Sequence, residues 1–454
     1  MAEAGDTRGR HAALLATLAL ALGGVVALGG WAGAAVAVSL MFVALLLSFG
    51  GPGLLAMTYI STRPLADVFV RIQFLGLSVG QLWSAGLLVV LVVWVASLGG
   101  RLSRREWLPL ISFVVVYVLL AMTRGDVADG AQRGLRLLSW MLIVPATSAA
   151  IVRGMNWRWA ASAGYAFALL ATLVSAYSAL TGRYGEAYYL AGSRLTMTYQ
   201  SPHALVTMLV LGAPFVLLAL IRDTSRWKWA HALLVVAMAT LTLVSLVRSG
   251  ILAMVVLLAA TALVVAWRGS RQQKGWLVAV SVGFVGAWVS LQDMFIDRLA
   301  ALLPAQAAAE GSVGSGRSWF WAAIADRVFQ SPADSLVGLG GGADTLIIHR
   351  ATGLLIGAHS DFFELLAVGG LVLVVAYASV VFVPVGRALT GLRTAQSTSD
   401  TRALRVMLVA ATAAFGVLGL TNGVAGYQGS IAYGLLVGMV LGISQGTRQG
   451  GRLL

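Results

Sequence analysis

The sequence predicts an all-α polytopic membrane protein, a transmembrane helical bundle of about 12–14 spans. The chain of 454 residues is 59% hydrophobic and 11% charged, and its mean hydropathy is +0.88. Apolar runs of roughly 18 to 22 residues, enough to cross a bilayer, recur along nearly its whole length. Short charged or Gly/Pro-rich breaks separate these runs. A water-soluble fold could not bury this much apolar surface in one core, so we expect the chain to lie in a membrane.

Thirteen spans follow from the apolar runs, within a single integral membrane domain over residues 1–454. They lie at 12–29, 32–49, 78–99, 107–123, 137–152, 159–180, 203–221, 229–246, 249–267, 276–291, 361–385, 404–420 and 429–444. The first run has no small-residue cleavage site after it, so we expect it to be retained. The segment 50–77 is broken by Gly, Pro and charged residues, which favours an interfacial or re-entrant segment.

Basic residues in short links predict the orientation of the bundle. The cationic links, which we expect in the cytoplasm, are 100–106, 222–228, 268–274 and 386–405. Alternation then places four links on the outer side: 181–202, 247–250, 292–360 and 421–428. The link 124–136 disagrees with the rule, because it carries three arginines and yet falls outside.

Charge and cysteine content exclude several classes of function. The chain has a formal net charge of +14, and only Lys228 and Lys274 are lysines among its 31 basic residues. Genome composition explains part of this arginine excess, but guanidinium groups also bind phosphate oxygens in pairs. A positive membrane protein therefore suits membrane lipids with anionic headgroups or a phosphorylated lipid substrate. The basic residues form no stripe, which argues against nucleic acid. With no cysteine, the chain has no disulfide, thiolate metal site or cysteine nucleophile.

The long link 292–360 is the segment most typical of a functional loop. Residues 311–329, GSVGSGRSWFWAAIADRVF, predict a short amphipathic helix after Arg317 that lies on the membrane surface. Residues 338–344, GLGGGAD, lack the Gly-Lys-Ser/Thr ending of a phosphate-binding loop, which favours a flexible turn. The loop ends in IGAHSDFFELL, residues 356–366, where polar residues precede the next span.

Four residues in the outer links are candidates for a site. Asp361 and Glu364 have the spacing of a helix cap, which explains both carboxylates without a function. A cap does not need His359, which could serve as a general base. Arg248, in the tight turn SLVRSGILA, and Arg317 are suited to an external anion such as a diphosphate. Arg194 lies on the same side and is a third candidate, although it could only anchor its loop.

No metal-binding motif or cofactor site accompanies these residues. The outer links contain no Asp-x-Asp pair and no His-x-x-x-His, so we expect neither a metal nor a cofactor. Transfer of a sugar from a lipid diphosphate fits such a set. The leaving diphosphate needs positive charge, and the attacking hydroxyl needs one base.

Five motifs in order resemble those of the O-antigen ligase and O-antigen polymerase superfamily of bacterial membrane glycosyltransferases. They are RLTMTYQSPH (194–203), SLVRSG (245–250), SGRSWFW (315–321), LGGG (339–342) and AHSDFFELL followed by a Gly pair (358–370). The N-terminal half matches only as hydrophobic spans. Ser360 stands where the family commonly has asparagine, which affects only the flank of the histidine.

The resemblance implies a GT-C-like fold with a large extracytoplasmic loop, residues 292–360, carrying short interfacial helices. It implies a multi-pass enzyme of polysaccharide biosynthesis in the bacterial inner membrane, with its active site on the periplasmic side. Such an enzyme moves a glycan from an undecaprenyl-diphosphate-linked donor to an acceptor glycan or glycolipid without metal. The family's essential residues correspond to Arg248, Arg317 and His359.

Two alternatives stay open at this point. Ligases and polymerases use the same donor and chemistry, and we favour a polymerase because chain extension serves bacteria with or without an outer membrane. A transporter or flippase for a lipid-linked oligosaccharide belongs to a different class, as does a purely structural scaffold. Transporters usually carry internal repeats and polar residues at mid-bilayer depth, whereas the polar candidates here gather at one face.

Overall fold

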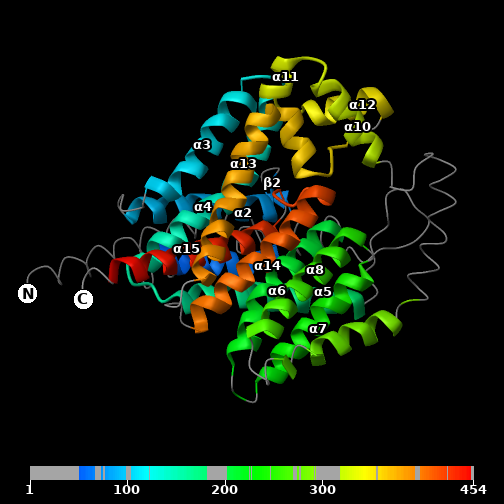
Figure 1. Ribbon diagram of the computed structural model, residues 1–454. Helices are drawn as coiled ribbons and strands as arrows, with labels where there is room; N and C mark the ends of the chain where they lie inside the picture. The colour runs from blue at the N-terminus through cyan, green and yellow to red at the C-terminus, as the bar shows by residue number, and fades with distance from the viewer. Residues whose placement is uncertain are drawn as a thin grey trace, which may run out of the picture.

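The computed structural model of the protein is almost all helical (Figure 1). It describes residues 51–66, 73–74, 77–98, 104–121, 123–180, 202–223, 225, 227–245, 247–268, 274–275, 278–290, 292, 317–353, 356–393, 399–426 and 428–450. Two short antiparallel strands pair with each other, β1 (Gln73–Phe74) and β2 (Leu77–Ser78). The labelled helices are α2 (Val79–Ser97), α3 (Arg104–Ala121), α4 (Val127–Val152), α5 (Trp157–Leu180), α6 (Pro202–Arg222), α7 (Lys228–Val244), α8 (Arg248–Arg268), α10 (Arg317–Val328), α11 (Pro332–Val337), α12 (Ala343–Thr352), α13 (Asp361–Arg393), α14 (Ser399–Asn422) and α15 (Gly429–Gly450).

Within the described residues, five helices are long and apolar enough to cross a membrane: α4, α5, α6, α13 and α14. Six shorter apolar helical segments accompany them, at 82–97, 108–121, 228–244, 248–263, 278–290 and 429–445. Together they coincide with the eleven predicted spans from 78–99 onward. This is the pattern of a multi-pass helical membrane protein. The predicted spans 12–29 and 32–49 lie outside the described residues.

Residues 51–66 form a helix, although the sequence there predicted an interfacial or re-entrant segment. Leu55 and Ile60 are buried in the main core, and Gly53 allows the helix to approach the ring of Trp94 in α2. Neither Pro52 nor Pro64 interrupts the helical residues 51–66.

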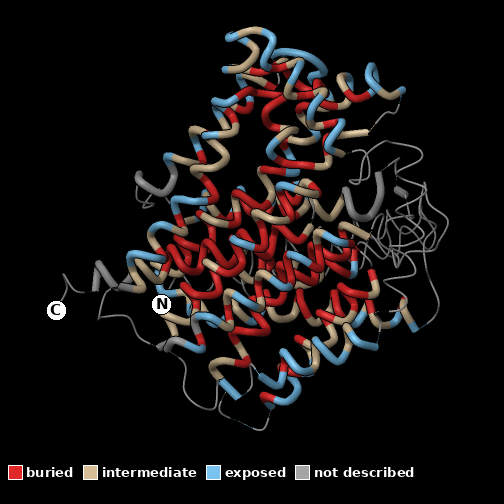
Figure 2. The backbone as a smooth tube through the Cα atoms, turned by 45° about the vertical axis from the view of Figure 1, so that its right-hand side comes forward, coloured by how far each residue is buried: buried red, intermediate tan, exposed pale blue. Residues whose placement is uncertain are grey.

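Helix α6 is the centre of the bundle. Nearly every residue from Ala204 to Leu218 is buried, as expected for a helix that is apolar on all sides. It packs against α5, α7, α8, α14 and α15, and Figure 2 shows the buried residues concentrated in this part of the molecule. Gly250 of α8 lies so close to Val206 of α6 that a Cβ would stand 1.9 Å from its Cγ1. The glycine that follows the predicted tight turn therefore also allows α8 to pack closely against α6.

Helix α15 packs on α4 through three glycines, four residues apart. A Cβ on Gly434, Gly438 or Gly442 would lie 2.5, 2.7 or 2.9 Å from a backbone carbonyl oxygen of α4. The partners along α4 are Trp140, Val144 and Ser148, so the two helices run in the same direction. Small residues that let backbones approach closely are typical of membrane helix pairs.

A cap, residues 317–353 with helices α10, α11 and α12, covers one end of the bundle (Figure 1). Phe320, Ile324 and Val328 form one buried stripe of α10 and face a second hydrophobic cluster that includes Ile348 and Leu366. This stripe is covered by protein, so a contact of α10 with the membrane surface would depend on its exposed aromatic residues.

The glycine-rich segment of the cap is a packed joint, so its interpretation as a flexible turn is wrong. Helix α13 breaks at Gly369 and Gly370, which have non-helical backbone angles. The backbone N–H groups of Leu339 and Gly340 donate to the C=O groups of Ala367 and Val368, at 2.8 and 2.9 Å. These bonds satisfy carbonyls beside the break. A Cβ on Gly338 would lie 2.5 Å from the backbone nitrogen of Gly369, so the joint requires glycine.

The arginines of the link 124–136 lie against the cap. Arg124 donates to the C=O of Gly338 at 3.1 Å, and Gly125 pairs with Gly341. At the opposite end of the bundle, Arg222 binds both carboxylate oxygens of Asp400, at 2.9 and 2.8 Å. The link 124–136 thus lies with the cap, which belongs to the loop 292–360, as helix alternation predicts, and two cationic links share the other end.

Candidate functional site

The N-termini of α6, α8 and α10 lie beside the C-terminus of α14, under the cap. Arg317, the first residue of α10, donates from Nη1 to the C=O of Thr421 (2.5 Å) and to Oδ1 of Asn422 (2.9 Å). Its Nη2 lies 3.5 Å from Nε2 of His203, in the first turn of α6. Asn422 donates from Nδ2 to Oγ of Ser249 (2.5 Å), in the first turn of α8. The carbonyl end of α14 offsets part of the guanidinium charge, and the helix N-termini around it add partial positive charge, which favours an anion.

His359 lies in the loop before α13, and two side chains hold the residue that precedes it. The N–H of Ala358 donates to Oδ2 of Asp344 (3.0 Å), and its C=O accepts from Nε1 of Trp321 (2.9 Å). His359 itself has φ 51°, in the left-handed region. A residue with a Cβ adopts this region at a cost of about 1–3 kcal/mol, and such strain is concentrated at functional positions.

The surroundings of His359 hold its pKa below the ordinary value of 6.5. Burial contributes most, because it disfavours the charged ring, and the positive charge of Arg317 acts in the same direction. The carboxylate of Asp344 opposes them. The imidazole is therefore neutral at pH 7, where it can accept a proton, and it lies within reach of the charge of Arg317.

The other two predicted arginines are less closely tied to this pair. Arg248 begins α8 and is exposed, one residue before the Ser249 that binds Asn422. Its backbone thus lies near the Arg317 contacts, but no contact joins its side chain to another residue in the described part of the chain. Arg194 lies outside the described residues.

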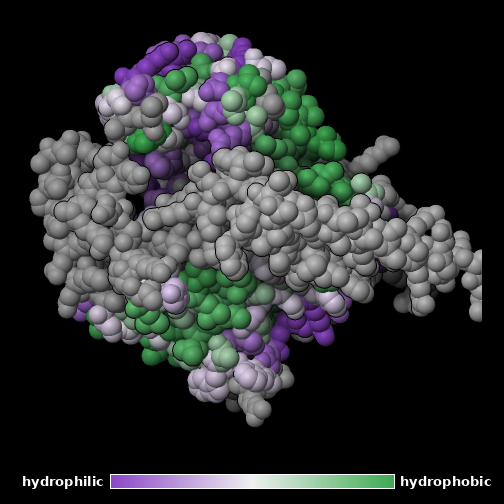
Figure 3. All heavy atoms as spheres, turned by 180° about the vertical axis from the view of Figure 1, so that it is seen from behind, coloured by the Kyte–Doolittle hydropathy of each residue, from purple (hydrophilic) through white to green (hydrophobic). Residues whose placement is uncertain are grey.

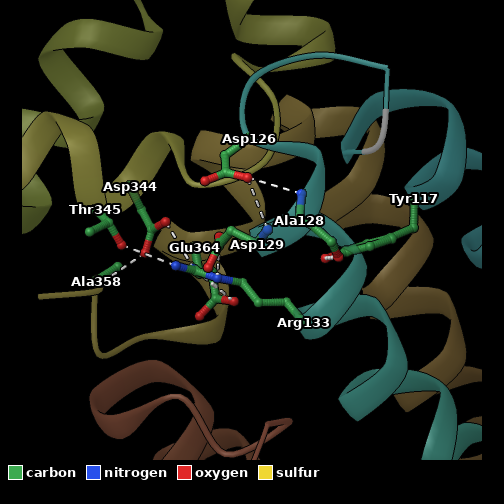
Figure 4. A network of polar contacts seen from close by, with 10 residues as sticks. Tyr117, Asp126, Ala128, Asp129, Arg133, Asp344, Thr345, Ala358 and Glu364 are labelled. Atoms are coloured by element: carbon green, nitrogen blue, oxygen red, sulfur yellow. Dashed lines mark hydrogen bonds and ion pairs between the residues drawn. The ribbon is translucent and has the colours of Figure 1, made fainter.

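A partly buried ion cluster that the sequence did not reveal lies beside the site (Figure 4). Arg133 of α4 contacts the carboxylates of Asp129 (2.7 Å), Asp344 (2.9 Å) and Glu364 (3.1 Å), and it donates to Oγ1 of Thr345 (3.0 Å). The side chain of Asp344 is 0% exposed. A guanidinium has five N–H donors, which allows one arginine to hold several oxygens. The cluster ties α4, α12 and α13 together, and through Asp344 it also fixes the backbone before His359.

The interpretation of Asp361 and Glu364 as a helix cap is wrong. The carboxylate of Asp361 accepts from the N–H of Ala425 (3.1 and 3.0 Å) and from the hydroxyl of Tyr377 (3.2 Å). Glu364 uses its carboxylate on Arg133. Both residues have capping spacing, but they bind partners far away in the chain instead of the first turn of α13. The two carboxylates therefore shape the region around His359.

A polar cavity of about 300 Å³ opens beside His359, between the first turns of α4, the start of α13 and the loop after α14. Seen from behind, hydrophilic side chains gather on the cap and in the recess beneath it (Figure 3). The cavity is lined by Asp129, Gln132, Arg133, Arg136, Leu137, Gly357, His359, Asp361, Glu364, Leu365, Asn422, Gly423, Ala425 and Gly426. A cavity of this size and polarity, with a neutral histidine in its wall, can hold a small polar group next to a base.

His203 and Asn422 are the site residues that sequence reasoning did not assign. His203 is the last residue of the motif 194–203, which is the local signal that could have singled it out, whereas Asn422, at the end of α14, lies near none of the predicted arginine motifs in the sequence. Among the described residues, no three His, Asp or Glu side chains come together as metal ligands. Positive charge at the site comes from arginine and from helix ends.

Comparisons with known proteins add no identification. No model of a known protein family matches the chain, and a search of curated proteins finds no significant match. What the chain does must therefore be argued from its own residues and from the motif resemblance.

Proposed function

We propose that the chain is a membrane glycosyltransferase of the O-antigen ligase and polymerase type. It transfers a glycan from undecaprenyl diphosphate to a hydroxyl of an acceptor glycan or glycolipid. The reaction takes place at the periplasmic face of the bacterial inner membrane. The observation that carries the proposal is a neutral, backbone-strained His359 that lies within electrostatic range of Arg317 under the cap.

Each group has a role in such a transfer. His359 takes the proton from the acceptor hydroxyl, and the oxygen attacks the anomeric carbon of the donor sugar. A new C–O glycosidic bond forms as the bond from that carbon to the diphosphate oxygen breaks. The lipid diphosphate leaves with the electron pair, and His359 later returns its proton to solvent or to the diphosphate. No oxidant, reductant or covalent enzyme intermediate is needed.

Arg317 stabilises the negative charge that grows on the leaving diphosphate. Its contacts with Thr421, Asn422 and His203 hold the guanidinium at the helix ends, so little reorganisation is required during the reaction. Arg248 starts the neighbouring helix and is exposed, which leaves its side chain available to the same phosphates. Arg194 enters the proposal on its motif alone.

A reconstituted transfer assay tests the proposal. The protein is placed in liposomes with undecaprenyl-diphosphate oligosaccharide isolated from cells that express the chain natively, and products are separated by length. We expect glycosidic products at the same rate with and without a chelator, because arginines neutralise the diphosphate. A ladder of repeat units supports a polymerase, and a single transfer to a glycolipid supports a ligase.

The assay also separates the transporter alternative. A flippase would move labelled lipid-linked oligosaccharide across the liposome membrane without forming a glycosidic bond. Transbilayer movement without bond formation, or bond formation that stops when divalent ions are removed, would count against the proposal.

A further inference from the structure

We infer that the polar cavity beside His359 binds the terminal sugar of the acceptor, while the donor diphosphate lies on the Arg317 side of the histidine. This inference rests on the proposed function and goes beyond it, because it divides the site between its two substrates. It starts from the positions of His359 and Asn422. Both line the cavity, and Asn422 also binds Arg317. These residues therefore form a wall with the cavity on one side and the arginine on the other.

Charge decides which substrate occupies the cavity. Three carboxyl groups line it, those of Asp129, Asp361 and Glu364, against the two guanidinium groups of Arg133 and Arg136. Arg133 already contacts two of these carboxylates. A diphosphate brought into the cavity would have to compete with Asp129 and Glu364 for the guanidinium of Arg133, which is unfavourable in a partly buried setting. The cavity is therefore unsuited to the donor diphosphate.

A sugar suits the same lining. Each sugar hydroxyl both donates and accepts a hydrogen bond, so it can use carboxylate oxygens and N–H donors together. Gln132 and Arg136 lie four residues apart on α4 and present donors to the cavity from one helix face. The volume of about 300 Å³ is at the small end of ligand pockets. It suits the end of a glycan chain rather than a long stretch of polysaccharide.

The arrangement explains why the base lies where it does. A hydroxyl of a sugar in the cavity would face His359, and the anomeric carbon under attack would lie beyond it, towards Arg317. The acceptor thus approaches from the side of α4 and the loop 423–426. The donor approaches from the side of α8 and α10.

Gly426 offers a direct test, because it lines the cavity and an added Cβ there meets nothing within 4 Å. The variant Gly426→Phe adds a ring at the cavity, and its Cβ meets no neighbour. We expect the KM for acceptor oligosaccharide to rise by about tenfold or more, with the KM for the lipid-linked donor unchanged. The matched control is Gly386→Phe, at an exposed position on α13 that also has open space and is not part of the cavity. It should leave both KM values unchanged.

A second variant and a binding measurement make the test independent of folding defects. Gln132→Ala removes one donor without adding bulk, and it should raise the acceptor KM by roughly threefold to tenfold. Saturation-transfer NMR with oligosaccharide released from its lipid by mild acid should show contact with the wild type and with Gly386→Phe, but not with Gly426→Phe.

Wild-type transfer with no effect of either cavity variant on the acceptor KM would overturn this inference and leave the proposed function standing. An equal rise of both KM values would overturn it too. No transfer by the wild type would instead overturn the proposed function.

Discussion

Replacing His359 with alanine should lower the rate of glycan transfer by roughly 10²–10⁴-fold, the usual contribution of a general base. The reason is that no other described side chain combines a neutral imidazole with a place in the cavity wall beside Arg317. The protein should still insert in the membrane and bind the lipid diphosphate, because the Arg317 contacts do not involve His359. Transfer rate and donor binding are measured in the same liposomes. His349→Ala is the matched control, since His349 is exposed on α12, and it should retain full activity.

The pH profile of the wild type checks the same role by another route. A base must be unprotonated, and the pKa of His359 is lowered by burial and by Arg317. The rate should therefore be constant at neutral and higher pH and should fall only as the pH drops below the ordinary histidine value of 6.5. The residual rate of His359→Ala should lack this acidic limb. Full activity in the variant, or an unchanged acidic limb, would remove His359 as the base.

Replacing Arg317 with alanine should reduce transfer by roughly 10²–10³-fold, because it removes the charge that stabilises the leaving diphosphate. Arg317→Lys should recover only part of the loss, since an ammonium keeps the charge but lacks the second nitrogen, which lies against His203 while Nη1 binds Thr421 and Asn422. Turnover at saturating donor and acceptor gives the measurement. Arg327→Ala is the control on the same helix, where the arginine pairs with Asp334 at 3.1 Å.

Rescue separates a charge role from a structural one at this position. Free guanidinium ion added to Arg317→Ala should restore part of the turnover if the missing charge is the cause. A variant that melts at the wild-type temperature and transfers at the wild-type rate would contradict the role of Arg317. So would an equal loss in Arg327→Ala.

The helical spans were predictable because an apolar run long enough to cross a bilayer carries its own signal. Each predicted span from 78–99 onward coincides with an apolar helical segment. His359 and Arg317 were candidates in the sequence, since each is a polar residue at a helix start that local structure does not require. The structure places the ring of His359 within electrostatic range of Arg317, from separate parts of the chain, and the sequence motifs alone could not establish that proximity.

The roles of Glu364 and of the glycine-rich segment depend on partners that are distant in the sequence. A prediction from local sequence patterns was therefore wrong for both. Glu364 has the spacing of a helix cap, but Arg133, more than two hundred positions earlier, offers it a charged partner. The segment around Gly340 looks flexible in sequence, because glycine has wide backbone freedom. The sequence does not show that the backbone of α13 packs against these glycines. Here that freedom lets the cap insert at the break of α13. Apolar spacing in α10 likewise predicts one buried face without saying whether protein or lipid covers it.

A structure of the protein with a donor analogue bound tests the central claim most directly. The analogue is an undecaprenyl-diphosphate glycan whose anomeric C–O bond is replaced by C–CH₂, so that it binds without transfer. We expect the diphosphate within hydrogen-bond distance of the Arg317 guanidinium, with the sugar facing His359 and the cavity left open beside it. A diphosphate bound at the opposite end of the bundle, near Arg222, or a sugar on the far side of the cap from His359, would contradict the account.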